Sequence, residues 1–502
     1  MNLYLRLVLC LLFTAVLVSA AILPAPLFRD GVVLQRDKPL PVWGTAEPGE
    51  RVEVHFRSQT ATAVAGADGR WQVTLQAESA SAEPAELVMT ARNTVVVHDV
   101  LVGDVWLCSG QSNMEWKVAA SADAEREIAA AIDPLIRHFK VPRTPASTPQ
   151  TDCGGQWESA APDTVGEFTA VGYYFAREWR KRTGVPVGLV NSTWGGTQIE
   201  SWIGDAALRT DPSHEAVAAR WQQWLDGHPA RVERHQVALQ KWRDEQAVAE
   251  KEGKPFTRRE PAVPEGAGSR REPASLYNGM IHPLQPFALR GVLWYQGEAN
   301  GERGAEYRTL FPTMIRQWRA EFGQGDLPFG FVQLANFERP VDKSGQQWAF
   351  LREAQTAALA LPATGMAVTI DIGDPQNIHP KNKQEVGRRL ALWAGAHLLG
   401  ELNAFTGPKF TGMEIEGAQL RLRFSEGQGL RTAGPVPTGF EVAGANRRFV
   451  PAMARIEGGT VVLTATGMQA PVAARYAWRN APEANLCNAD GLPAAPFRTD
   501  NW

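Results

Sequence analysis

Four short apolar runs are each followed by a cluster of polar residues and glycines, and this pattern constrains the fold more than any other feature. Short buried runs separated by segments with helical spacing predict strands of a mainly parallel sheet. In an open α/β sheet, ligands bind beyond the carboxyl ends of the strands, so the four clusters are expected to meet in one crevice. The runs are Val105–Leu107, Val187–Val190, Val292–Tyr295 and Met366–Ile370.

The clusters carry the groups that acyl transfer to a serine requires. Ser112 follows the first run, and the pair Gly195–Gly196 follows the second. Amide side chains follow the third run, and acids with a histidine follow the fourth. A serine beside a glycine is by itself most often a turn residue. The interpretation of Ser112 as a nucleophile therefore depends on the other clusters, which offer backbone N–H donors and a base.

The same blocks resemble those of the sialate O-acetylesterase family within the SGNH hydrolases. The resemblance covers nearly the whole mature chain and includes Leu101–Trp106 and Gly491–Asp500. It implies an SGNH-type three-layer α/β/α hydrolase domain with a mainly parallel sheet, and removal of acetyl groups from sugars. The four blocks are Gly110–Met114, Trp194–Thr197, Trp294–Glu298 and Ile378–Pro380.

Two histidines lie in contexts that resemble motifs, and only one suits the role of base. A serine must lose its proton as it attacks, and a histidine with a pKa near ~6.5 can accept it. His379 follows the last strand, where the resembled family and its superfamily place the base, so we expect it to serve Ser112. His282 precedes its strand and is expected at the opposite end of the sheet, in a structural role.

The acid that would orient His379 is open. The wider superfamily favours an aspartate three residues before the histidine, but this chain has the neutral Gln376 there. Asp374 on the same loop is the first candidate, Asp371 is the second and Glu298 is the third. The alternative is a dyad in which a backbone or amide group orients His379.

An oxyanion in the transition state needs donors aimed at the developing charge. The backbone N–H groups of Ser112 and Gly196 are the natural pair. The superfamily adds an asparagine after a later strand, and the matching block here offers Gln296, with Asn300 in reserve.

The composition is that of an ordinary globular protein, with 44% hydrophobic and 21% charged residues. A net charge of −3 gives no reason to expect nucleic acid or a membrane surface as a partner. No spacing of cysteine and histidine indicates zinc, and we expect neither a metal nor an organic cofactor. Of the cysteines outside the leader segment, Cys108 is expected to be a buried free thiol, and a Cys153–Cys487 bond is possible.

Residues 1–21 have the features of a signal peptide: Arg6, a short apolar core and the small-x-small site Val18-Ser19-Ala20. The apolar core is too short for a comfortable membrane span. The mature protein is therefore expected to be secreted or periplasmic.

Three modules are expected after the signal peptide. Short alternating strands and turns predict a β-sandwich-like module at 22–98. Residues 99–404 form the hydrolase domain, with a helical insertion at about 205–275, and 405–502 form a C-terminal β-rich module. We expect an exported carbohydrate O-acetylesterase acting on sialic acid or on acetylated plant glycans such as xylan or xyloglucan. The alternative is a non-catalytic glycan-binding protein with a vestigial hydrolase domain.

Overall fold

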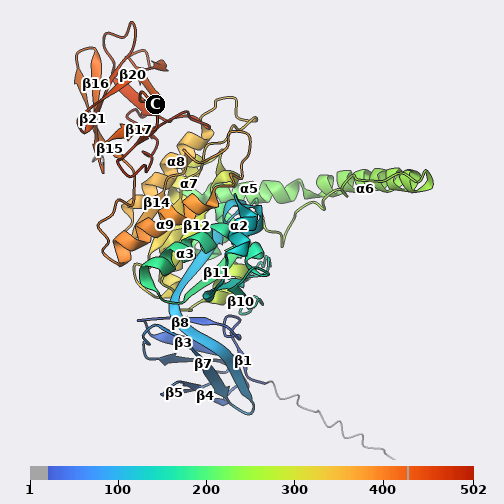
Figure 1. The fold of residues 1–502 in the computed structure, drawn as a ribbon. Coiled ribbons are helices and arrows are strands. Elements are labelled where there is room, and N and C mark those ends of the chain that lie inside the picture. The colour runs from blue at the N-terminus through green and yellow to red at the C-terminus, as the bar shows by residue number, and fades with distance from the viewer. Residues whose placement is uncertain (1–20, 427–428) are drawn as a thin grey trace, which may run out of the picture.

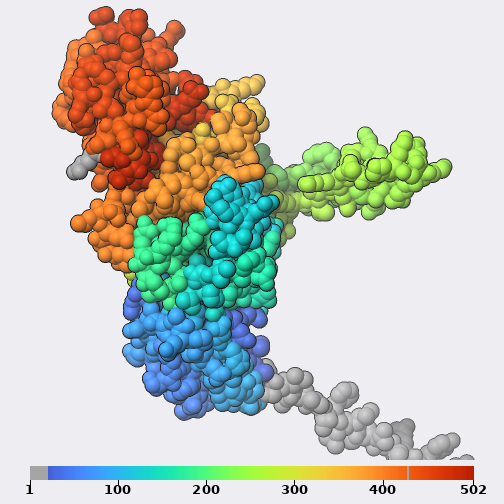
Figure 2. All heavy atoms as spheres, in the orientation of Figure 1, coloured from blue at the N-terminus to red at the C-terminus, as the bar shows by residue number. Residues whose placement is uncertain are grey.

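The computed structural model describes residues 21–426 and 429–502. An N-terminal β module, a central α/β domain and a C-terminal β module follow one another along the molecule (Figure 1). A helical arm projects sideways from the central domain (Figure 2). The expected signal peptide falls outside the described residues apart from Ala21, and it stays a prediction.

The N-terminal module contains a three-stranded sheet, β1-β3-β6, and strands that join the sheet of the central domain. In β4 and β6, buried residues alternate with exposed ones, so one face of each strand lies in the core. The strands are β1 (Leu23–Pro24), β2 (Val33–Gln35), β3 (Leu40–Thr45), β4 (Arg51–Phe56), β5 (Gln59–Val64), β6 (Arg70–Leu75) and β7 (Ser81–Thr90).

Strand β8 (Thr94–Gly110) runs through both this module and the central domain. Its first part pairs with β7 and β2, and its second part pairs in parallel with β11 (Val187–Thr193) and β12 (Gly291–Tyr295). Residues 100–110 are all buried and all belong to the strand, with no turn between them. The module boundary expected between residues 98 and 99 therefore lies inside one continuous strand.

The central part of the sheet has the order β10-β9-β11-β8-β12-β13-β14. The neighbours from β9 to β14 are parallel, and β10 is antiparallel to β9. The chain goes from β8 outward to β9 on one side and later to β12 on the other, so the strand order reverses beside β8. The strands not yet bounded are β9 (Asp133–Lys140), β10 (Trp157–Ala160), β13 (Phe329–Val332) and β14 (Thr364–Ala367).

Helices cover both faces of this sheet, and β13 shows why. Phe331 on one face packs against Phe311 of α7, with ring centroids 5.0 Å apart. On the other face, a Cβ added to Gly330 would lie 2.4 Å from the ring of Trp393 in α9. The small residue thus admits a tryptophan. The helices of this domain are α1 (Ser112–Glu115), α2 (Ala124–Ala129), α3 (Ala170–Thr183), α7 (Gly304–Phe322), α8 (Gln347–Ala357) and α9 (Lys383–Leu398).

The helical insertion expected at about 205–275 contains α4 (Asp205–Thr210), α5 (Glu215–Asp226) and α6 (His228–Lys251). None of the residues in α6 is buried, and the helix forms the projecting arm with the chain that returns from it (Figure 2). Trp242 of α6 packs against Phe256 of the returning chain, with ring centroids 5.4 Å apart. The arm therefore depends on contacts within itself.

The C-terminal module holds two four-stranded sheets and one two-stranded sheet. A hydrogen bond from Asn480 to Asp342, 2.9 Å long, ties the module to the central domain. The predicted fold class, a three-layer α/β/α domain flanked by β modules, is confirmed. The strands are β15 (Lys409–Glu416), β16 (Gln419–Ser425), β17 (Arg431–Thr432), β18 (Phe440–Ala443), β19 (Phe449–Pro451), β20 (Met453–Glu457), β21 (Thr460–Thr464), β22 (Ala473–Tyr476), β23 (Leu486–Cys487) and β24 (Phe497–Arg498).

Three cysteines, Cys108, Cys153 and Cys487, are buried free thiols, so the possible bond between the last two is not formed. Burial raises the pKa of the Cys153 thiol to about 12. Within residues 21–426 and 429–502, no helix is both long and apolar enough to cross a membrane.

Candidate active site

Ser112 and His379 lie in contact at the carboxyl end of the central sheet. The distance between Ser112 Oγ and His379 Nε2 is 2.8 Å. Ser112 begins α1, two residues after β8 has ended at Gly110. Gly110 has a φ of +132°, and a Cβ there would lie 2.2 Å from the carbonyl oxygen of Tyr295. Only glycine fits at this point, where the strand bends to present the serine.

His379 is half-buried, and its ring has an aromatic partner. Trp116 stacks on it with ring centroids 4.9 Å apart and an interplanar angle of 19°. Its backbone N–H donates to Asn377 Oδ1 over 2.9 Å. Burial, and then the nearby charge of Lys383, lower the pKa of His379 below its ordinary value. Such a histidine is neutral, and able to accept a proton, at near-neutral pH.

The two aspartates expected to orient His379 bond to other groups, one on the loop and one on α9. Asp374 Oδ1 accepts the backbone N–H of Gln376 over 2.9 Å, and no hydrogen bond joins it to His379 among the described residues. Asp371 forms a two-pronged ion pair with Arg389, with N–O distances of 2.7 and 2.6 Å. Both acids are close to His379 in the sequence. In the structure, however, Asp374 accepts from the backbone of its own turn and Asp371 pairs with an arginine of α9.

Glu298, the third candidate acid, lies behind the pair rather than against the imidazole. Its Oε1 accepts from Asn113 Nδ2 over 2.5 Å, and its Oε2 is buried with no hydrogen-bond partner. Burial raises the pKa of this carboxyl above its ordinary range. Its hydrogen bond to Asn113 thus joins this carboxylate to the residue that directly follows Ser112.

The two backbone donors expected for the oxyanion have no acceptor among the described residues. Neither the N–H of Ser112 nor that of Gly196 donates a hydrogen bond there, and Gly196 has a φ of +73°. The glycine loop lies directly against the serine: a Cβ added to Gly195 would be 3.2 Å from Ser112 Cβ. The N–H of Gly195 is taken by Glu115 Oε2 at 3.0 Å, which leaves the next N–H in the loop free.

Gln296 and Asn300 brace the interior instead of pointing a free donor at the serine. Gln296 Nε2 donates to the carbonyl of Thr197 over 3.1 Å and to Asn300 Oδ1 over 2.8 Å, which uses both of its N–H groups. Asn300 Nδ2 donates to Glu200 Oε2 over 2.9 Å. In this geometry Gln296 has no N–H group left for the oxyanion, and Asn300, the reserve, uses one of its two N–H groups on Glu200.

Four residues that carry the site were not assigned from the sequence. Asn113 lies in the serine block and Glu115 directly follows it, and this position was the only available signal. Trp116 lies beside them, and its stacking on His379 has no sequence signature. Lys383 is fully buried, and nothing in the pattern distinguishes it from an exposed lysine at the start of a helix.

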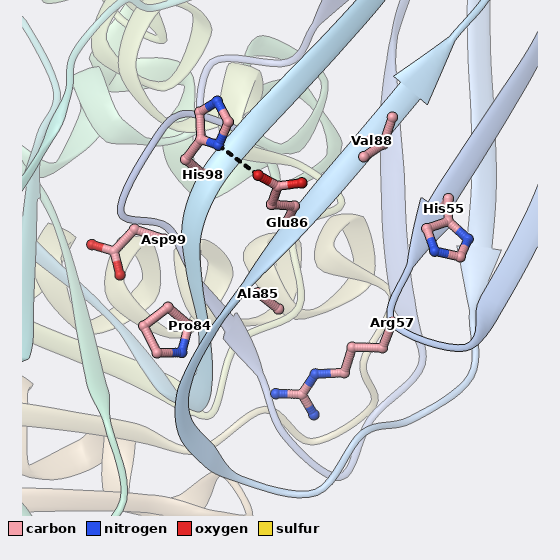
Figure 3. Close-up of a pocket in the computed structure, with 8 residues that line it drawn as sticks. All are labelled: His55, Arg57, Pro84, Ala85, Glu86, Val88, His98 and Asp99. Atoms are coloured by element: carbon pink, nitrogen blue, oxygen red, sulfur yellow. Dashed lines mark hydrogen bonds and ion pairs between the residues drawn. The ribbon is translucent and has the colours of Figure 1, made fainter.

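Other candidate positions lie away from this site. His282 Nδ1 contacts the carbonyl oxygen of Gln150 at 2.8 Å, in keeping with a structural role. An open hollow of about 530 Å³ on the N-terminal module is lined by eight residues, and its His98 pairs with Glu86 over 3.0 Å (Figure 3). The lining of this hollow contains no serine or cysteine. In the described part of the chain, no group of three or more histidine, cysteine or acidic side chains could hold a metal ion.

Comparison with known proteins agrees with this geometry. A family model described as carbohydrate esterase, sialic acid-specific acetylesterase, matches residues 102–228 and 267–394. This chain belongs to that family. The family consists of carboxylic ester hydrolases, so the predicted enzyme class is confirmed and the alternative of a non-catalytic glycan-binding protein is set aside.

Individual relatives cover almost the whole chain. The sialate O-acetylesterase of Mus musculus is 32% identical over 91% of this chain and 90% of its own length. The Homo sapiens sialate O-acetylesterase is 29% identical over 94% of this chain and 91% of its own. A crystal structure of a carbohydrate acetylesterase from Xanthomonas citri is 43% identical, with a TM-score of 0.82, and covers 96% of this chain and 100% of that one.

The family match is interrupted at residues 229–266. These residues are nearly all of α6 and most of the chain that returns from it. The projecting arm is therefore outside the part of the chain that matches the family model, whereas Ser112, Gly196 and His379 are inside it.

Proposed function

We propose that this chain is an exported carbohydrate O-acetylesterase that works through an acyl-enzyme on Ser112. Ser112 Oγ attacks the acetyl carbonyl carbon while His379 Nε2 takes its proton. The same proton then passes to the sugar oxygen as the ester bond breaks and the sugar leaves. His379 next removes a proton from water, which attacks the acetyl-serine, and returns it to Ser112 Oγ as acetate leaves.

The observation that carries this proposal is the 2.8 Å contact between Ser112 Oγ and His379 Nε2 beside two unused backbone N–H groups. A nucleophile within hydrogen-bond reach of its base is the first requirement of this chemistry. The donors of Ser112 and Gly196 are proposed to bind the oxyanion, because removal of one such donor in measured hydrolases costs about 10²–10³ in rate.

For the acid we propose that Asp374 acts on His379 through the backbone of its loop. Asp374 Oδ1 holds the N–H of Gln376, the carbonyl of Asp374 accepts from the N–H of Asn377 over 3.1 Å, and Asn377 Oδ1 holds the N–H of His379. This chain of bonds supports the position of the imidazole without a carboxylate on the ring. In this arrangement Ser112 and His379 work as a dyad.

The surroundings of Ser112 favour an acidic sugar over a neutral one as the acetylated substrate. Trp194 precedes the glycine that touches Ser112, and the guanidinium groups of Arg143 and Arg270 lie 6.0 and 5.8 Å from its ring centroid. Arg143 is more than half exposed and pairs with Glu115. Arg270 pairs with Glu265 over 2.6 Å, so a substrate carboxylate would share these guanidinium groups. Aromatic faces pack against sugar rings, and arginine binds carboxylates in a fork. We therefore place sialic acid ahead of acetylated xylan or xyloglucan.

The test is acetate release from a panel that contains acetylated sialic acid, acetylated xylan and 4-nitrophenyl acetate. We expect hydrolysis of 4-nitrophenyl acetate and of at least one glycan, with the acidic sugar preferred. A serine-directed organophosphonate should inactivate the enzyme and add its mass to the peptide that contains Ser112. Labelling of another residue, or no hydrolysis of any ester by the exported mature chain, would contradict the proposal.

A further inference from the structure

Lys383 is a fully buried lysine directly behind the Ser112–His379 pair. It is the first residue of α9, where the positive end of the helix dipole opposes an ammonium group. Burial of an ammonium group is also costly unless it is paired. Both the helix dipole and burial disfavour the ammonium group here, so the presence of a lysine at this position indicates that it has a function.

The ammonium group has one hydrogen bond and two aromatic neighbours. Lys383 Nζ donates to Asn113 Oδ1 over 2.6 Å. It lies 5.4 Å from the ring centroid of Tyr295 and 5.9 Å from that of Trp116. Trp116 also stacks on His379, so the indole ring is a neighbour of both the lysine and the catalytic base.

Asn113 connects this lysine to three other parts of the site. Its Nδ2 donates to Glu298 Oε1 over 2.5 Å and to the carbonyl of Ile378 over 2.9 Å. Ile378 directly precedes His379, and Asn113 directly follows Ser112. The amide thus bridges the serine turn and the histidine loop, with a carboxylate on one side and an ammonium group on the other.

We propose that Asn113, Glu298 and Lys383 form one positioning unit that sets Ser112 against His379 and keeps His379 in its proton-accepting form. The inference rests on the proposed function and adds residues that act through the dyad, not on the substrate. We refer to these three residues as the buried charge unit. It replaces the orienting carboxylate, since Asp374 and Asp371 are bound elsewhere.

The electrostatics of the neighbouring groups agree with this role. The positive charge of Lys383 lowers the pKa of His379, in addition to burial. Burial lowers the pKa of Lys383 to about 7, and the negative charge of Glu298 opposes that shift. Tyr295, which also faces the lysine, stays neutral because burial raises the pKa of its hydroxyl. The carboxylate thus helps to retain the ammonium charge that acts on the base.

The experiment compares Lys383→Met with a matched control, Lys38→Met. Lys38 is also largely buried, with a pKa lowered to about 8, but its Nζ bonds to the carbonyl of Leu289 and to Gln324 at the other end of the sheet. Both variants are assayed with 4-nitrophenyl acetate across pH, after their melting temperatures have been measured. Ser112→Ala in parallel tests the proposed function separately.

For Lys383→Met we expect kcat to fall by about 10²-fold with little change in KM, because a small misplacement of reacting groups has that effect. The acidic limb of log(kcat/KM) should move to higher pH, because the charge that lowers the pKa of His379 is gone. Lys38→Met should alter neither quantity. A purely packing role for Lys383 would leave the acidic limb in place.

A double variant, Lys383→Met with Glu298→Gln, keeps the test decisive if the single variant does not fold. It removes both charges together, so no unpaired ion is left in the interior. Residues that act as one unit give losses that do not add, so the double variant should be no slower than the worse single one. If only the double variant folds, wild-type turnover by it would overturn the proposal. If Lys383→Met folds as well, additive losses or a native acidic limb in that single variant would overturn it. If Ser112→Ala keeps full activity, the proposed function itself fails.

Discussion

Two buried carboxylates near opposite ends of the central parallel sheet are bound very differently. Asp104 is fully buried and accepts from Arg36 Nε at 2.9 Å, Arg36 Nη2 at 3.1 Å and Trp179 Nε1 at 2.8 Å. Glu298, at the carboxyl end, has one donor, Asn113, and an Oε2 with no partner. Both oxygens of the first carboxylate are satisfied, and one oxygen of the second is not.

This difference separates a group that holds the fold from a group that serves the site. A buried charge with complete hydrogen bonds resists change, and removal of its partners destabilises the protein. A buried polar atom without a hydrogen-bond partner is unfavourable and persists only where the surrounding structure holds it in place. Such atoms cluster at functional sites. We therefore expect changes at the Asp104 end to affect stability and changes at the Ser112 end to affect rate.

The largest effect should come from Ser112→Ala. This change removes only a hydroxyl at the carboxyl end of β8, so turnover should fall by on the order of 10⁶. The melting temperature should stay at the wild-type value. Turnover of 4-nitrophenyl acetate by the purified variant, measured beside calorimetry, checks both expectations. Retained activity would remove the serine from the mechanism.

The next effect should come from Asp104→Ala at the other end of the sheet. It leaves Arg36 and Trp179 without their acceptor, so the free energy of unfolding should fall by about 3–5 kcal/mol. The kcat of the fraction that remains folded should be unchanged. Urea denaturation and active-site titration with a phosphonate measure these two quantities. A fall in kcat per titrated site would mean that Asp104 also affects catalysis at the Ser112 end of the sheet.

The pH profile of the wild-type enzyme tests the surroundings of His379 at the Ser112 end of the sheet. Burial and Lys383 lower the pKa of His379, so the base stays neutral at lower pH than an ordinary histidine does. The acidic limb of log(kcat/KM) should therefore lie below pH ~6.5. An acidic limb at or above that value would show that a negative group, not Lys383, dominates the surroundings of the imidazole.

The smallest effect is expected for Asp374→Asn. An asparagine oxygen can accept the same N–H of Gln376, so turnover should fall by less than about tenfold if the aspartate only braces the loop. A carboxylate bonded to the imidazole would instead cost up to about 10⁴ on the same change. The kcat of this variant, compared with that of Asp371→Asn as the control on the same loop, distinguishes a dyad from a triad.

The sequence predicted which chain segments meet but not how their side chains bond. Apolar runs that end in polar clusters place Ser112, Gly196 and His379 at one edge of the sheet, because parallel strands share an edge. Glycines in the sequence also end two helices: Gly184 after α3 and Gly323 after α7 both adopt the left-handed conformation that ends a helix.

The rest depends on contacts between segments far apart in the chain. Gln296 has the residue type and position of an oxyanion donor, yet its N–H groups are used by Thr197 and Asn300. Lys383 has the pattern of a surface residue, but in the folded protein it is buried and its Nζ donates to Asn113 in the serine turn. One-dimensional spacing contains no information on such partners.

The continuity of β8 has a consequence for how the chain folds as it is synthesised. The second part of β8 emerges with the N-terminal module, but its two neighbours, β11 and β12, end only at Thr193 and Tyr295. Until then a buried strand has open edges, which are templates for wrong pairing. The N-terminal module therefore cannot complete its own folding early, and a chain interrupted before residue 295 should aggregate, not yield a stable fragment.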